Sequence, residues 1–144
     1  MNAKREIARW NNGDFDASRA RWLLARTRLT DEMLAGLKGL QAVRLVLAGN
    51  PIEGRGLQFF REAENLRELS LSGPEFKNAT ELAGLTQLES LSLTNTEIGD
   101  AGIGLLQSLK KLKALKLEGS KVTAAGVAAL RAELPDCKIS WDGE

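Results

Sequence analysis

The 144-residue sequence contains no histidine. Histidine is the side chain that most often acts as a general base near neutral pH, activates a serine or cysteine nucleophile and ligates metal ions. The sequence also lacks the Gly-x-x-x-x-Gly-Lys-Ser/Thr loop that holds nucleotide phosphates. These two absences predict a protein that is not an enzyme and that uses no metal and no cofactor.

A single cysteine, Cys137, excludes an intramolecular disulfide and favours a reducing compartment. No run of 18 uncharged apolar residues occurs, and no apolar stretch of signal-peptide length follows the basic residues near the start. We therefore expect one cytoplasmic domain without a membrane segment. Basic and acidic side chains number 20 and 19, so no overall electrostatic field favours nucleic acid or an anionic membrane.

One apolar pattern, Leu-x-x-Leu-x-Leu, recurs at intervals of 22 and 24 residues. Its clear copies begin at Leu66, Leu88 and Leu112. A unit this short cannot bury its own apolar face, so stacked units must share one core. In a degenerate last copy the apolar positions are Leu134, Cys137 and Ile139, which makes Cys137 a small buried hydrophobe. The sequence therefore predicts a solenoid of about four to five coils.

The period of two along a strand decides which side chains face the core. The last two leucines of each copy face inward, and the residues between them face solvent. The first copy allows two registers, one built on Leu40, Val43 and Leu45 and the other on Leu45 and Leu47. The registers differ by one strand period, so Val43, Leu45 and Leu47 are expected to face the core in both.

A short helix is expected after the apolar anchor of each copy. The anchors are Ile52, Phe76, Ile98 and Val122. Glycine follows three of them by four residues, at Gly56, Gly102 and Gly126. Because glycine inside a helix costs about 1 kcal/mol relative to alanine, its recurrence indicates close packing of the backbone on the neighbouring coil. Apolar residues then recur at a spacing of three, and Thr123 or Asp100 can cap such a helix.

The third coil departs from this pattern. Pro74 precedes its anchor, and Thr80 stands where glycine is expected. We expect the segment between Phe76 and Leu85 to be irregular or tightly wound.

Two segments carry a family resemblance, Ile98-Gly99-Asp100-Ala101-Gly102-Ile103 and Val122-Thr123-Ala124-Ala125-Gly126-Val127. They are similar to the short leucine-rich repeats of ribonuclease-inhibitor-like and F-box-associated proteins and their bacterial relatives, and the resemblance covers residues 29–144. It implies an α/β fold, a right-handed solenoid with a parallel β-sheet on the concave face and short helices on the convex face. It also implies a role in binding other proteins.

Repeats of this family often place Asn or Cys three residues after the inner leucine, where the side chain bonds the turn backbone. The corresponding residues here are Asn50, Pro74, Thr96 and Ser120. Only Asn50 matches, so a continuous asparagine ladder is not expected. Thr96 and Ser120 are expected to make weaker versions of the same bonds.

Residues 1–28 do not repeat and are expected to form a helical N-terminal cap. Ile7 and Trp10 predict one short helix, and Trp22 and Leu23 predict a second. The segment holds seven basic and three acidic residues, so an alternative function is binding of nucleic acid or an acidic partner through this cap. Helical spacing of the aromatic residues favours buried tryptophans beneath a solvated surface instead.

The outward strand face contains two pairs of side chains with residue types that occur in catalytic sites. The carboxylates of Glu68 and Glu118 lie on strands two apart with an offset of four residues, about 16 Å between backbones, whereas glycosidase pairs need less than about 10 Å. Ser92 and Lys116 are expected neighbours in one row, but an exposed lysine stays charged and is a poor base. Neither arrangement predicts catalysis.

The outward strand face is the remaining candidate for binding. Its predicted contact residues are Arg44, Val46, Glu68, Ser70, Ser72, Ser90, Ser92, Thr94, Lys116 and Glu118. Its centre is small and hydroxyl-rich and lacks aromatic anchors, which favours a weak or shape-based contact, and an inert solvated sheet is the competing interpretation.

We expect a non-enzymatic protein-protein interaction module with another protein as its partner. A scaffold segment of a larger protein is the further alternative. The C-terminal edge from Cys137 to Trp141 lacks an obvious capping helix, so further chain, weak self-association or Trp141 alone is expected to cover it.

Overall fold

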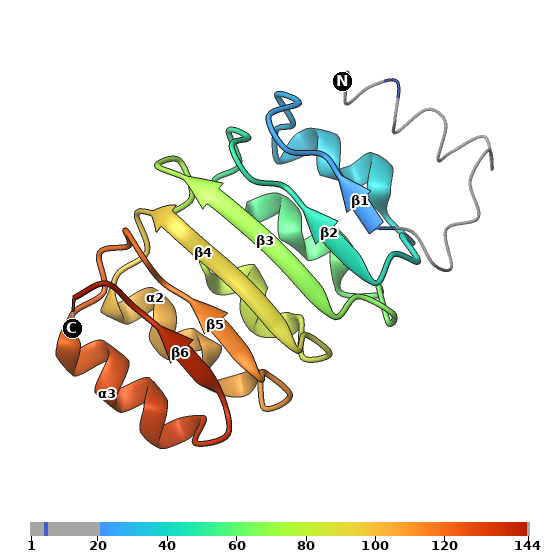
Figure 1. The fold of residues 1–144 in the computed structure, drawn as a ribbon. Coiled ribbons are helices and arrows are strands. Elements are labelled where there is room, and N and C mark those ends of the chain that lie inside the picture. The colour runs from blue at the N-terminus through green and yellow to red at the C-terminus, as the bar shows by residue number, and fades with distance from the viewer. Residues whose placement is uncertain (1–4, 6–20, 144) are drawn as a thin grey trace.

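The computed structural model describes Arg5 and residues 21–143. Within that range one sheet of six strands has its strands in chain order, and every neighbouring pair is parallel (Figure 1). The strands are β1 (Arg21–Leu23), β2 (Arg44–Val46), β3 (Glu68–Gly73), β4 (Ser90–Thr96), β5 (Ala114–Lys116) and β6 (Lys138–Ser140). Because each connection returns the chain to the adjacent position in the sheet, one repeat adds one strand, as in a leucine-rich-repeat solenoid.

Short helical segments connect the strands and lie behind the sheet in Figure 1. They are the 3-10 helices η2 (Glu32–Leu37), η3 (Arg55–Phe60), η4 (Thr80–Gly84) and η5 (Leu105–Ser108), and the α-helices α2 (Asp100–Gly104) and α3 (Ala124–Glu133). The 3-10 form suits apolar residues spaced by three, because a helix with three residues per turn places them on one line. Helix η4 gives the third coil the tight winding predicted for it, but η2, η3 and η5 are 3-10 helices as well, so the predicted departure of this coil from its neighbours is wrong.

One apolar core runs through all the coils. The inward residues Leu45, Leu69, Leu91, Leu115 and Ile139 are register partners across β2 to β6. The first four are at most 2% exposed and Ile139 is 7% exposed. The coils therefore share a core that is sealed in its middle and slightly more open at the last strand.

The facing prediction is wrong at Val43, whose side chain is 38% exposed. Strand β2 begins only at Arg44, so the period of two does not extend back to Val43. The Val43 carbonyl instead accepts hydrogen bonds from the Arg67 and Glu68 amides at 2.9 and 3.0 Å. Leu45 and Leu47 are buried, which selects the register counted back from Ile52.

A helix at Trp22 and Leu23 is also a wrong prediction, since residues 21–23 form β1 and pair with β2. The pairing continues beyond the strand, because the Leu24 amide donates to the Val46 carbonyl at 2.9 Å. An unpaired edge of β2 overrides the weak local helix pattern. The sheet thus starts inside the segment expected to be a cap, and the helix predicted at Ile7 and Trp10 lies outside the described residues.

The three recurring glycines differ in what they pack against. A Cβ at Gly56 would lie 2.4 Å from the Asp31 carbonyl oxygen, and one at Gly126 would lie 2.2 Å from an Asp100 carboxylate oxygen. Both contacts come from the preceding coil, which confirms the predicted close approach. At Gly102 the nearest atom belongs to Ile98 of the same coil, at 3.1 Å.

Asn50 binds two neighbouring turns together. It is 2% exposed, and its carboxamide oxygen accepts from the Thr27 and Leu29 amides at 2.9 and 3.0 Å. Its carboxamide nitrogen donates to the Leu24 and Leu47 carbonyls at 2.7 and 2.9 Å. A single side chain thus satisfies four backbone groups that packing has removed from water.

The weaker bonds expected at Thr96 and Ser120 form at only one of the two positions. The Thr96 hydroxyl donates to the Leu93 carbonyl at 2.9 Å. The Ser120 hydroxyl oxygen is buried and has no hydrogen-bond partner among the described residues. The prediction is therefore confirmed for Thr96 and wrong for Ser120.

The turn after each inner leucine contains a residue with positive φ that the leucine pattern did not reveal. Gly49 and Gly119 both have φ of 70°, Asn95 has 55° and Arg26 has 54°. Glycine and asparagine tolerate this left-handed conformation, whereas arginine adopts it against a steric penalty. A left-handed arginine at position 26 indicates that the coil containing β1 departs from the repeat consensus at this turn.

Trp141 covers part of the C-terminal edge. It is partly buried against the core, and its indole N–H donates to the Val122 carbonyl at 3.1 Å. The Arg131 guanidinium donates to the Ile139 carbonyl of the edge strand at 3.4 Å. Within residues 21–143, no helix has the length and apolar character needed to cross a bilayer.

Asn50 and Ser120 occupy equivalent turns and make a matched pair for mutation. Asn50→Ala is expected to lower the free energy of unfolding by about 2–4 kcal/mol, because it leaves buried backbone groups without their hydrogen-bond partners. Ser120→Ala is expected to change it by less than about 0.5 kcal/mol or to raise it, because this hydroxyl is buried without a bond. Urea unfolding followed by circular dichroism measures both, and equal losses would contradict the assignment.

Candidate functional site

Strand pairing brings the predicted contact residues together on one face of the sheet. The first row contains Arg44, Glu68 and Ser90, the second Val46, Ser70, Ser92 and Lys116, and the third Ser72 and Thr94. Glu118 follows two residues after Lys116, beyond the last residue of β5. All ten positions are exposed or half-buried, so their predicted outward placement is confirmed.

A shallow hollow of about 160 Å³ lies in the middle of this strand face. Its lining comprises Arg44, Glu68, Leu69, Ser70, Ser90, Ser92 and Lys116. Small-molecule pockets usually measure about 300–1,000 Å³. The hollow therefore has room for a single side chain, and it exists because serines stand where larger side chains would fill the sheet surface.

An ion pair borders the hollow on β2 and β3. The Arg44 guanidinium lies 3.5 Å from the Glu68 carboxylate, and both side chains are 45% exposed. A pair this exposed contributes little stability, but each charge neutralises the other. Lys116 on β5 forms no ion pair within residues 21–143, so one positive charge in the lining has no acidic partner there.

Glu118 differs from the other acidic residues of the face. It is half-buried, and one of its carboxylate oxygens is buried without a hydrogen-bond partner among the described residues. Glu68 is paired with Arg44 and lies two strands away. The two carboxylates thus do not converge, as the sequence predicted.

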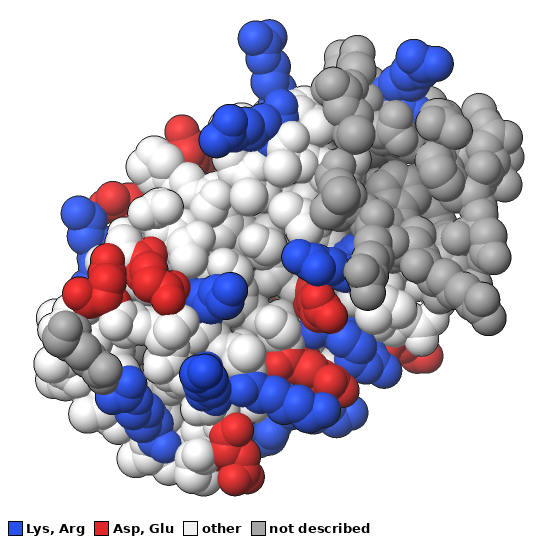
Figure 2. Space-filling view, in the orientation of Figure 1, with Lys and Arg blue, Asp and Glu red and all other residues white. Residues whose placement is uncertain are grey.

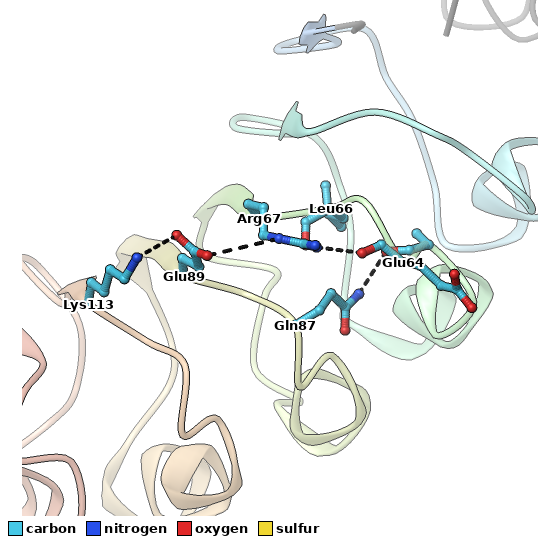
Figure 3. A network of polar contacts seen from close by, with 7 residues as sticks. Glu64, Leu66, Arg67, Gln87, Glu89 and Lys113 are labelled. Carbon is cyan, nitrogen blue, oxygen red and sulfur yellow. Dashed lines mark hydrogen bonds and ion pairs between the residues drawn. The ribbon is translucent and has the colours of Figure 1, made fainter. Parts of the chain in front are cut away.

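A chain of charges runs across the turns that precede the strands (Figure 3). Glu89 lies between Lys113, at 3.0 Å, and Arg67, at 4.0 Å. Arg67 in turn donates to the backbone carbonyls of Glu64 and Leu66. The hydrogen bond from Lys113 chiefly lowers the pKa of Glu89, and the charges of Lys113 and Arg67 add to this effect.

Acidic residues of neighbouring coils contact some of the lysines between residues 110 and 116. Lys110 lies 3.6 Å from Glu133 and Lys113 lies 3.0 Å from Glu89. Figure 2 accordingly shows basic and acidic side chains interspersed on the viewed face rather than one field of a single sign.

A second concavity, which the sequence pattern did not reveal, measures about 320 Å³ and lies between α2 and α3. Its lining is mostly small and aliphatic, with Asp100, Gly104, Gln107, Ala125, Gly126, Ala129, Leu130 and Glu133. At its edge Asp100 accepts hydrogen bonds from the Thr123 hydroxyl at 2.6 Å and the Thr123 amide at 2.8 Å. These bonds lower the pKa of Asp100. Thr123 also caps α3, as predicted, by accepting from the Gly126 amide.

Residues 84–106 match the family model described as leucine-rich repeat. Among solved structures, internalin C2 of Listeria monocytogenes is 23% identical, with a TM-score of 0.48 over 74% of this chain and 54% of that one. Internalin F of the same organism is 20% identical, with a TM-score of 0.53 over 75% of this chain and 43% of that one. The chain spans about half the length of these internalins. No curated protein matches it.

The recurrent leucines, the parallel sheet in chain order and the match at residues 84–106 identify a leucine-rich-repeat protein. The likeness to internalin F supports the same fold. The predicted α/β architecture, with a parallel sheet on one face and short helices on the other, is therefore confirmed. Proteins of this class are typically non-enzymatic interaction modules.

Glu89 provides a test of the charge network. Its pKa in the folded protein should lie below the usual 4.5, and Lys113→Gln should raise it toward 4.5, because the leading cause of the shift is lost. A depressed pKa stabilises the fold above pH 4.5, and this stabilisation disappears as pH falls through the lower folded value.

Carboxyl-carbon NMR titration of Glu89 measures the shift directly. Lys121→Gln is the matched control, since Lys121 lies 3.9 Å from Glu97 instead, and it should leave Glu89 unchanged. Titration of Glu89 at its ordinary pKa in the unmodified protein would contradict the network.

Proposed function

We propose that this chain is a protein-protein interaction module that binds its partner through the strand face, with the ten predicted contact residues at the interface. The observation that carries the proposal is that helical segments cover one side of the sheet, whereas no helical segment of residues 21–143 covers the other side (Figure 1). The open side holds the ten outward positions in aligned rows and contains the hollow. Repeat proteins characteristically use such an extended face for binding.

The dimensions of the strand face limit the strength of such an interaction. Six strands at about 4.8 Å spacing span about 24 Å, and four residues along a strand span about 13 Å. The product is roughly 300 Å², well below the 800 Å² or so that each partner contributes to a standard interface. A partner that contacts this face alone therefore binds weakly, and a tighter one also uses the surrounding turns.

The residue types of the face support the same conclusion. Hydroxyl side chains occupy its centre, and no described residue there supplies the aromatic anchor that dominates tight interfaces. We therefore place this module among weak or transient binders rather than obligate complexes. We also propose a cytoplasmic location, because a chain with the single cysteine Cys137 forms no internal disulfide, as is usual in a reducing compartment.

Comparative affinity capture tests the proposal. The double variant Ser92→Trp with Lys116→Glu fills the hollow and reverses its free charge. Proteins captured from native extract by the unmodified chain should be depleted about tenfold on this variant.

The control places the same two substitutions away from the face, as Ala128→Trp on α3 with Lys111→Glu in a turn, both at exposed positions. It should retain the captured proteins. Circular dichroism verifies that both variants fold. Equal retention by the two variants would refute binding through the strand face.

A further inference from the structure

We propose that the hollow on the strand face binds one acidic side chain, an aspartate or glutamate, presented by the protein partner. This inference rests on the proposed function, since it specifies the chemistry of the same surface. It assigns Lys116 as the charge that recognises the carboxylate and the serines as hydroxyl donors that orient it.

Lys116 supplies the positive charge of the proposed site. Lysines on adjacent segments contact acids of neighbouring coils, as Lys113 does with Glu89 and Lys121 with Glu97. Lys116 is exposed, lines the hollow, and makes neither an ion pair nor a hydrogen bond within residues 21–143. A free ammonium group in a concave surface is the feature that an incoming carboxylate complements.

The balance of charge in the lining favours a single negative charge. Of its two cations, Arg44 is already paired with Glu68 at 3.5 Å, which leaves Lys116 alone uncompensated. Glu118, two residues further along the same face, repels additional negative charge. A phosphate group carries about −1.5 to −2 and is typically bound by clustered arginines, so the hollow suits a carboxylate better than a phosphate.

The hydroxyl groups of the lining supply the second half of the site. The side chains of Ser70, Ser90 and Ser92 make no hydrogen bond within the described residues, although they surround the hollow. Hydroxyl hydrogens rotate to suit an acceptor, and hydrogen bonds to an ionised group are stronger than neutral ones. Ser92 is the register partner of Lys116, so donor and cation lie on adjacent strands.

The size of the hollow fits one such side chain. About 160 Å³ corresponds to roughly five water molecules at about 30 Å³ each. An aspartate or glutamate side chain fits within this space, whereas a nucleotide or a cofactor does not. The site is therefore a specificity pocket for one residue within a wider protein contact.

Selection from a random 12-residue peptide library displayed on phage tests the inference on the full chain. Selected pools should be enriched in Asp or Glu at one position on the unmodified protein. Lys116→Gln should remove the enrichment, and Lys116→Glu should exchange it for Lys or Arg. Lys138→Gln is the matched control, because Lys138 is exposed on the same sheet outside the hollow, and it should preserve the enrichment.

Fluorescence anisotropy with one selected peptide then gives the affinity. Lys116→Gln should weaken binding about tenfold, whereas Lys138→Gln should not change it. Replacing the acidic residue of the peptide by Asn or Gln should weaken its binding to the unmodified protein by the same factor as Lys116→Gln does. The same replacement should change the affinity of the peptide for the Lys116→Gln variant little.

The outcomes separate the two proposals. Peptides that bind without acidic enrichment, yet are lost on Ser92→Trp, would overturn the acidic-residue inference and leave the strand face as the binding surface. Peptides unaffected by Ser92→Trp, or no selected peptides, would overturn both. An acidic preference that survives Lys116→Gln would show that another group recognises the carboxylate.

Discussion

The apolar core shared between successive coils is the constraint on which the rest of this structure depends. No coil encloses its own leucines, so Leu91 is buried only because β3 and β5 place Leu69 and Leu115 on either side of it. This sharing holds the strands parallel and in chain order, and the helical segments of residues 21–143 all lie on one side of the sheet. No described helical segment covers the opposite side, and its outward residues take no part in the core.

The fold can be predicted from the sequence because the recurrent leucines mark the buried positions. The candidate face follows from the two-residue period of a strand. The exposure of Val43 does not follow from the sequence, because periodicity does not state where a strand begins. The strand at Trp22 does not follow from it either, because a sheet edge outweighs a local helix pattern. The hollow depends on which residues stand opposite one another across β2 to β5, and the free hydroxyl of Ser120 depends on exact turn geometry. Neither follows from spacing along a single chain.

Electrostatics in this molecule is mostly local and reciprocal. Acids and bases about one repeat apart neutralise each other, as Glu89 does with Lys113 and Arg67, and basic and acidic side chains number 20 and 19 in the whole sequence. Among the described lysines without an ion pair, Lys116 is the one that lines the hollow on the strand face. The hollow thereby has a preferred ligand chemistry, because Lys116 is the one cation of its lining without an ion pair among the described residues and lies beside hydroxyl groups that make no hydrogen bond there.

Native-state hydrogen exchange on Leu91→Ala tests the shared core most directly. The substitution opens a cavity expected to cost about 2–5 kcal/mol. If the coils share one core, amide protection should fall together in β3, β4 and β5, while Ser92→Ala, on the solvent side of the same strand, should leave protection unchanged. Loss of protection confined to β4, or equal effects of the two substitutions, would contradict a core held in common and the facing derived from it.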